Sequence, residues 1–513
     1  MADFLAGSQA LFLDPTGLMI FVFGVIGGML FGAIPGVNML TLGAVLLPFT
    51  VTMEPHHAIM LFAVIYCSGV FGGAITAILF NIPGAPENAP TCFDGYPMTV
   101  QGRAGKAIGA AVSCSALGGV ASAILMMSAT PLIANWAVHA FGPQEIFSLI
   151  CFGLAVSASV GAKSLWRGWL SIFLGLLIAT IGTDPAGGIP RFDKGSIVGI
   201  EYASYYLSAG IHFIPMILGF FAVAEIFTQA EKIATGTRER PKASIEFPTW
   251  LEFWQVRFTI IRSMVVGFFA GILPGIGATL AAFLSYSQAV RWSKTPEKFG
   301  KGELAGVVAS ETANNAATGA AMIPLLALGL PGGALTAMIM GIFQIHGMEP
   351  GPLVFINSHD LVWVTFAAMF YANVAILFLG WVQTKTVVHL LRVPFRWLAP
   401  GILMLATVGA FALRNLIVDV WVMFLAGIAG YLLRKTGYSA AGIVLGLILG
   451  KLGESTFSKS MQLMDYDYTG FLTRPISALL LTAAFATIAW NIVGEIRHTR
   501  RIDAEADLAA PAD

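Results

Sequence analysis

The sequence has few charged residues. Only 11% of its 513 residues are Asp, Glu, Lys or Arg, whereas an average soluble domain has about 25%. Lys and Arg together number 28, as do Asp and Glu, so the formal charge is zero and no overall basic excess favours nucleic-acid binding. These absences argue against an ordinary soluble domain and against a nucleic-acid-binding protein.

Cysteine is scarce, and several motifs that mark enzymes are missing. The four cysteines have no short paired spacing of the kind that binds zinc or forms a redox dithiol, so we interpret them as small apolar side chains. The sequence also lacks a His-Glu-x-x-His pair, a Gly-x-x-x-x-Gly-Lys loop and a Gly-x-Ser-x-Gly turn. We therefore expect no enzyme, no catalytic residues, no metal site and no tightly bound cofactor.

Long apolar segments account for most of the chain. Hydrophobic residues make up 57% of it, and the mean hydropathy is +0.79. A bilayer core about 30 Å thick is spanned by a helix of about 20 apolar residues. Apolar segments occur near 17–50, 58–80, 107–134, 143–161, 168–183, 209–228, 258–290, 304–346, 361–382, 398–413, 415–433, 437–450 and 475–496. The sequence predicts an all-α polytopic membrane protein with about 12 transmembrane helices.

The apolar run at 263–290 is too long for one span and too short for two. Pro274 and Gly275 interrupt it near its middle, and the loops on both sides are rich in Lys and Arg. Because basic loops lie on the cytoplasmic side, we predict a helical hairpin that enters and leaves the membrane on the same side. The same rule places the basic tail, which begins at Arg497, in the cytoplasm.

A segment with mixed charges divides the chain almost evenly. We predict a first membrane repeat at 1–228, a charged cytoplasmic linker at 229–256, a second membrane repeat at 257–456, and a C-terminal helix with a cytoplasmic tail at 457–513.

The two halves share a pattern of glycines and breaks. Glycine recurs every fourth residue at Gly24, Gly28, Gly32 and Gly36, and again at Gly267, Gly271 and Gly275. Each series ends in a Pro-Gly pair, and each half has a second pair downstream, Pro83-Gly84 or Pro331-Gly332. Glycine at this spacing alone indicates close helix packing. Interrupted helices at matching positions of two halves are typical of secondary transporters with inverted repeats, whose binding site lies at the breaks.

Polar residues at and after these breaks form the predicted substrate site. Helix N-termini and uncharged polar side chains there can hold an anion. The predicted substrate-binding residues are Pro35, Gly36, Asn38, Thr41, Pro83, Gly84, Pro274, Gly275, Gly277, Thr279, Asn314, Asn315, Thr318, Pro331 and Gly332. The two asparagines either join helices to one another or line a cavity.

Ion coupling is predicted for Ser310, Glu311 and Asn315. Glu311 is either a buried cation or proton site, or a carboxylate near the cytoplasmic mouth that is paired with a loop lysine. The segments around the breaks contain no Lys or Arg, so a multivalent anion there would need Na+ or H+ as a partner.

Several segments, in this order and spacing, resemble the large membrane subunit of the tripartite tricarboxylate transporters, the TctA family. These segments, which lie within residues 16–440, are Gly32-Ala33-Ile34-Pro35-Gly36, Asn81-Ile82-Pro83-Gly84, Asp94-Gly95-Tyr96-Pro97-Met98, Gly271-Ile272-Leu273-Pro274-Gly275, Glu311-Thr312-Ala313-Asn314-Asn315-Ala316 and Gly329-Leu330-Pro331-Gly332. One departure is Pro86-Glu87-Asn88, where small residues are expected in many relatives.

The resemblance implies a secondary active transporter that imports di- or tricarboxylates across the bacterial inner membrane, driven by a sodium or proton gradient. It also implies two partners: a small membrane subunit of about four spans and a periplasmic solute-binding protein. A passive anion channel or a membrane scaffold is the alternative, although neither needs symmetrical broken helices. An intramembrane enzyme would need a nucleophile and base or a metal constellation, which the sequence lacks.

Overall fold

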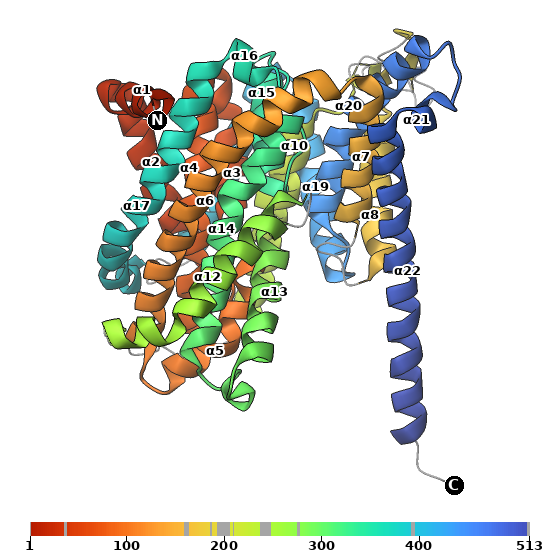
Figure 1. The fold of residues 1–513 in the computed structure, drawn as a ribbon. Helices are drawn as coiled ribbons and strands as arrows, with labels where there is room; N and C mark the ends of the chain where they lie inside the picture. The colour runs from red at the N-terminus through yellow and green to blue at the C-terminus, as the bar shows by residue number, and fades with distance from the viewer. Residues whose placement is uncertain are drawn as a thin grey trace. The chain divides into compact units, whose positions relative to one another are not determined.

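The computed structural model describes residues 2–34, 38–158, 164–184, 187–191, 206–208, 210–235, 248–273, 277–390 and 395–509. These residues are mainly helical, and one short antiparallel pair joins β1 (Gly182–Thr183) to β2 (Pro190–Arg191) (Figure 1). The prediction of an all-α polytopic membrane protein is confirmed.

The chain forms two compact units. Unit 1 contains Met1–His139 and His212–Tyr431, and unit 2 contains Ala140–Ile211 and Leu432–Asp513. The first part of unit 1 comprises α1 (Ala2–Leu13), α2 (Pro15–Gly32), α3 (Met39–Leu46), η1 (Leu47–Thr52), α4 (Pro55–Phe80), η2 (Pro86–Asn88), α5 (Ala89–Val100) and α6 (Ala104–Ala140). Its second part comprises α10 (Phe213–Ile217), η3 (Leu218–Val223), α11 (Ala224–Thr235), α12 (Trp250–Ile272), α13 (Gly277–Trp292), η4 (Pro296–Lys298), α14 (Leu304–Leu328), α15 (Ala334–Ile345), α16 (Val354–Asn357), α17 (His359–Leu390), α18 (Phe395–Arg414) and α19 (Ile417–Lys435).

Unit 2 is a smaller group of helices. It comprises α7 (Pro143–Ser157), α8 (Leu165–Ala179), the β1–β2 pair, α20 (Ala440–Leu463), α21 (Gly470–Thr473) and α22 (Pro475–Ala509). Gly175 of α8 and Gly446 of α20 meet closely, because a Cβ atom at Gly175 would lie 2.9 Å from the Cα atom of Gly446. The hydroxyl groups of Ser148 and Ser477, 2.7 Å apart, join α7 to α22.

Nine helical segments among the described residues are long and apolar enough to cross a membrane. They are α2, α4, α6, the segment Phe213–Glu231, α12, α17, α19, α20 and the first part of α22. Shorter apolar helices occur at Met39–Thr52, Pro143–Ser157, Leu165–Ala179, Ala334–Ile345 and Ala399–Arg414. The total of about 12 spans stays a prediction.

Helices α4 and α14 form the centre of unit 1. Nearly all residues of both are buried, although α14 is too polar to qualify as a span by hydropathy because Glu311 and the adjoining asparagines interrupt its apolar sequence. Burying a polar helix requires that its side chains find partners within the protein. The polar residues of α14 therefore indicate where a functional site can lie.

Both glycine series lie in tight helix contacts. A Cβ atom at Gly28 would lie 2.1 Å from the Ser68 hydroxyl oxygen of α4, and one at Gly271 would lie 2.7 Å from the Cα atom of Ala317 in α14. Helix α2 thus packs on α4, and α12 packs on α14, at distances that only glycine permits. The packing interpretation of the stripes is confirmed for the described glycines, while the inverted relation of the halves stays a prediction.

Helices α12 and α13 run side by side in opposite directions. The Ser285 hydroxyl donates to the Ser263 hydroxyl over 2.7 Å, and the Arg262 guanidinium lies 4.7 Å from the ring centre of Trp292. Residues almost equally far from the interruption at 274–276 therefore meet, as in an antiparallel hairpin. The predicted hairpin has this helical geometry, and its position in the membrane stays a prediction.

The predicted linker at 229–256 overlaps the end of α11 and the start of α12. Its centre, 236–247, lies outside the described residues. The repeat boundaries drawn from the sequence therefore remain predictions.

Candidate functional site

The two central helices end in the same way. Asn81 after α4 has a φ of 55° and Gly329 after α14 has a φ of 74°, both in the left-handed region. The next amide in each case donates six residues back, from Ile82 to Thr76 over 3.4 Å and from Leu330 to Pro324 over 3.0 Å. Both helices therefore end at a left-handed residue, in a turn one residue wider than the 6→1 turn of a Schellman motif. Each cap turns the chain directly into a Pro-Gly break.

The described elements that flank the breaks lie next to one another in pairs. A Cβ atom at Gly84 would lie 2.7 Å from the carbonyl oxygen of Gly32, where α2 ends. A Cβ atom at Gly277, the first residue of α13, would lie 3.0 Å from the carbonyl oxygen of Gly332. The end of α2 therefore adjoins the first downstream break, and the start of α13 adjoins the second.

Tyr66 of α4 connects the two pairs. Its hydroxyl lies 3.8 Å from the position of a Cβ atom at Gly277, and α13 packs against η2, which carries Glu87. Glu87 is 6% exposed. A carboxylate from the first half thus lies close to the start of α13 in the second half.

Glu311 is fully buried among uncharged hydrogen-bond donors. Its carboxylate accepts hydrogen bonds from the Thr91 hydroxyl at 2.5 Å, the Ser115 hydroxyl at 3.2 Å and the Asn88 amide at 3.4 Å. The Thr91 hydroxyl also lies 2.9 Å from the Ser310 hydroxyl. The partners come from α5, α6 and η2, so the carboxylate stands where three segments of the first half meet α14.

These contacts bear on the two interpretations of Glu311. Its described partners are neutral side chains within the protein, and no contact to a loop lysine is found among the described residues. A buried carboxylate with neutral partners is costly when ionised. This environment favours the buried cation or proton site over the surface ion pair.

Three asparagine side chains around Glu311 have carbonyl oxygens without a donor. The amide groups of Asn88, Asn314 and Asn315 donate to backbone oxygens of Val70, Glu87 and Cys67 at 2.9, 3.5 and 3.3 Å. Their Oδ1 atoms are buried and have no hydrogen-bond partner among the described residues. Buried acceptors are normally satisfied. A ligand with donors, or a cation, would complete this set of oxygens.

Other predicted site residues have local structural roles. Asn38 caps α3, because its side-chain oxygen accepts from the Thr41 amide at 3.0 Å, and the Thr41 hydroxyl donates to the Phe221 carbonyl at 3.3 Å. The Thr318 hydroxyl donates to the Asn315 carbonyl at 2.8 Å. The hydrogen bonds of Asn38 and Thr41 thus lead to α3 and η3 and not to Glu311.

The remaining predicted residues divide between described and undescribed parts of the chain. Thr279 is half-buried in the first turn of α13. Four predicted residues lie outside the described residues: Pro35, Gly36, Pro274 and Gly275.

Sequence reasoning missed four polar residues of this site. Glu87, Asn88, Thr91 and Ser115 lie in the first half, more than 190 positions from Glu311. In the sequence, these residues could have been suspected only from the Pro86-Glu87-Asn88 segment, which departs from the pattern expected in many relatives. The Asn88 side chain fits beside α4 because residue 73 is a glycine. A Cβ atom at Gly73 would lie 2.1 Å from the Asn88 side-chain oxygen.

Comparisons with known proteins agree with the resemblance. Residues 18–445 match the Tripartite tricarboxylate transporter TctA family. An Agrobacterium vitis protein named "Uncharacterized 52.8 kDa protein in TAR-I ttuC' 3'region" is 35% identical over 491 residues, covering 95% of each chain. A second, "Uncharacterized protein in TAR-II ttuC' 3'region" from the same organism, is 37% identical over 234 residues, covering 46% of this chain and 97% of its own length. No solved structure matches the chain.

The match spans most of the chain and includes all four Pro-Gly breaks and the Glu311 segment. The chain belongs to the tripartite tricarboxylate transporter TctA family.

Proposed function

We propose that this chain is the carboxylate-translocating membrane subunit of a secondary active transporter in the bacterial inner membrane, with its C-terminus in the cytoplasm. It works with a small membrane subunit and receives substrate from a periplasmic solute-binding protein. Family membership supports the transporter class and the need for partner subunits. The direction of transport and the coupling ion are proposed from the site.

The observation that carries the proposal is the neutral environment of the buried Glu311 carboxylate. Beside it are the unsatisfied oxygens of Asn88, Asn314 and Asn315. Oxygen donors with one carboxylate suit a hard cation such as Na+, and the carboxylate alone suits a proton. We therefore assign ion coupling to Glu311, with Ser310 and Asn315 as its neighbours on α14.

The substrate carboxylates bind next to this cation, at the paired breaks. The N-termini of α3, α13 and α15 begin there, and each helix start carries about half a positive charge. Bound Na+ or H+ offsets the further charge of a di- or tricarboxylate, because desolvating an uncompensated carboxylate is too costly. Binding of ion and substrate is thereby coupled.

The test is uptake of a labelled tricarboxylate into proteoliposomes that contain this chain and its small subunit. Sodium and pH gradients are applied separately, with the binding protein present on the outside. We expect uptake above equilibrium with one of the two gradients. Uptake that only reaches equilibrium, whatever gradient is applied, would show a passive channel and overturn the proposal.

A further inference from the structure

A second cluster of polar side chains lies in unit 1, at the opposite end of α4 from the Pro83-Gly84 break. Asp14 precedes α2, and its side-chain oxygen Oδ1 accepts from the Thr16 amide at 3.0 Å. His56 and His57 follow Pro55 in the first turn of α4. Val70, which contacts the Glu311 site, is 13 residues further along this helix, or about 20 Å at 1.5 Å per residue.

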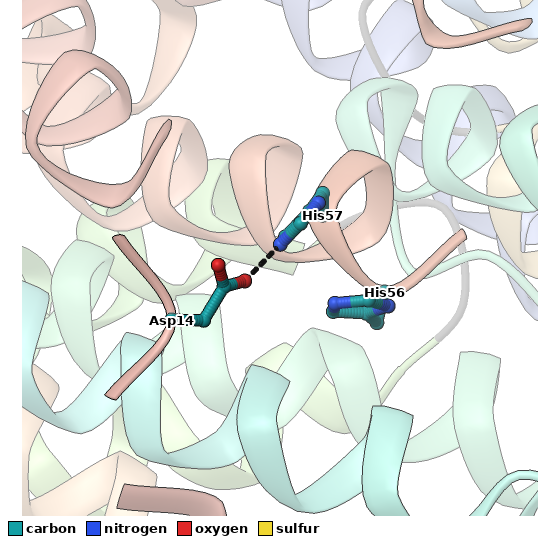
Figure 2. A group of neighbouring side chains, drawn as sticks. All are labelled: Asp14, His56 and His57. Carbon is teal, nitrogen blue, oxygen red and sulfur yellow. Dashed lines mark hydrogen bonds and ion pairs between the residues drawn. The ribbon is translucent and has the colours of Figure 1, made fainter. Parts of the chain in front are cut away.

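The three side chains converge on one point. His57 Nε2 lies 2.5 Å from Asp14 Oδ2, and the ring centres of His56 and His57 are 4.0 Å apart. One donor atom from each of the three residues lies within 4.8 Å of the other two. Figure 2 shows the His56 ring beside the Asp14–His57 pair, with a ring nitrogen on the side that faces Asp14.

There is room for a ligand beside these atoms. The cluster lines a cavity of about 500 Å³ that also contacts Met348, Ser358 and Asp360. Gly17 keeps the donor atoms accessible, because a Cβ atom there would lie 2.7 Å from Asp14 Oδ2 and 3.2 Å from His57 Nε2.

We propose that Asp14, His56 and His57 bind one divalent transition-metal ion of the zinc class. Two imidazole nitrogens and one carboxylate oxygen are a ligand set for Zn²⁺, whereas Mg²⁺ and Ca²⁺ prefer oxygen alone. Three protein ligands leave a fourth position open, which water fills. The ion replaces the proton shared by Asp14 and His57, which is released to solvent.

Such an ion would join the corner between α1 and α2 to the start of α4. The sequence motifs predicted no metal site, because Asp14 stands 42 positions before His56 and two adjacent histidines match no metal motif. The inference is independent of the proposed transport function.

The test titrates the full-length, tag-free protein in detergent with Zn²⁺, and measures heat of binding and bound metal after gel filtration. We expect one ion per chain. His56→Ala removes a ligand but leaves the Asp14–His57 hydrogen bond, so the protein should fold and its Zn²⁺ affinity should fall by about tenfold or more. His139→Ala, at an exposed position on α6, is the control and should bind as the wild type does.

Co²⁺ provides a second measurement, because a four-coordinate site gives strong visible absorption that the hydrated ion lacks. We expect this absorption in the wild type and its loss in the triple variant Asp14→Asn, His56→Ala, His57→Ala. Equal Zn²⁺ affinity of His56→Ala and His139→Ala, or a Co²⁺ spectrum of the hydrated ion in the wild type, would overturn the proposal.

Discussion

Glu311 illustrates how a single residue acquires its role from its neighbours. Its hydrogen bonds come from Thr91, Ser115 and Asn88, which supply dipoles but no positive charge. An ionised carboxylate in such a place needs a counter-ion, and a neutral one holds a proton. In the proposed function, either state lets the residue bind the coupling cation or proton.

Glu311→Gln should separate folding from coupling. The amide has the shape of the carboxylate and keeps an acceptor for Thr91, but it can neither ionise nor bind a cation strongly. We expect normal insertion with loss of gradient-driven uptake, measured in proteoliposomes. Glu297→Gln, at an exposed position in η4, should transport normally. An unchanged dependence of the Glu311→Gln variant on the gradient would exclude Glu311 from coupling.

Substitutions of Asn314 and Asn315 can show whether these side chains bind a ligand or only hold helices together. A hydrogen bond between membrane helices averages about 0.6 kcal/mol, whereas a bond to a charged ligand contributes about 1.5–3 kcal/mol. Asn314→Ala or Asn315→Ala should therefore weaken substrate or cation binding by about tenfold or more while the protein stays stable in detergent. Asn357→Ala, at an exposed position, is the control. If both variants unfold, the asparagines hold helices together; if both transport normally, they lie outside the site.

At the scale of elements, glycines determine which helices touch. Gly28 lies against Ser68, and Gly271 lies against Ala317, so α2 meets α4 and α12 meets α14 with almost no side chain between them. Close packing of this kind stabilises helix pairs in a membrane, where lipid tails remove the hydrophobic driving force between helices.

Gly271→Ala should destabilise the protein, because the new Cβ atom would lie 2.7 Å from the Cα atom of Ala317. Overpacking of this kind costs about 1–3 kcal/mol. At Gly401 in α18 nothing lies within 4 Å of the Cβ position, so Gly401→Ala should be neutral or stabilising by up to about 1 kcal/mol. Thermal unfolding in detergent measures both. Equal effects of the two substitutions would contradict tight α12–α14 packing.

If α12 and α13 form a hairpin, the start of α12 and the end of α13 lie on the same side of the membrane. Gln255 near the start of α12 and Lys298 after α13 line one cavity of about 600 Å³. Gln255→Cys and Lys298→Cys should react with a membrane-impermeant thiol reagent from the same face of the membrane, the cytoplasmic one by the positive-inside rule. The unsubstituted chain is the control. Labelling from opposite faces would show that the segment crosses the membrane once, and would contradict the hairpin.

At the scale of the whole molecule, the chain is a multi-pass membrane protein of a transporter family whose members act with partner subunits. Inward movement of a multivalent anion against a negative-inside potential costs about 2.3 kcal/mol per charge per 100 mV. For the proposed import, co-transported cations would have to offset at least this cost.

Uptake from dilute substrate should therefore need both a cation gradient and the periplasmic binding protein. We expect omission of either to reduce initial rates of carboxylate uptake to those of protein-free liposomes. The control adds a binding protein with its substrate pocket blocked. Full uptake without the binding protein would mean that the membrane subunits capture substrate by themselves.

The membrane class, the Pro-Gly pairs, the close packing at the glycine stripes and the family could all be inferred from the sequence alone. These features are local in the chain: hydropathy, proline, and glycine at helical spacing act through the residues around them. Glu311 and the two asparagines were also recognisable, because polar residues stand out within a buried helix.

The side chains of the first half that surround Glu311 could be identified only from the packing of the folded chain. Asn88, Thr91 and Ser115 reach it because α5, α6 and η2 pack on α14, and no spacing along the chain encodes a contact across about 200 residues. The same reason applies to Asp14 and the two histidines of α4. The same holds for Asn38, whose side chain caps α3 by accepting from the Thr41 amide; its predicted contact with substrate stays a prediction.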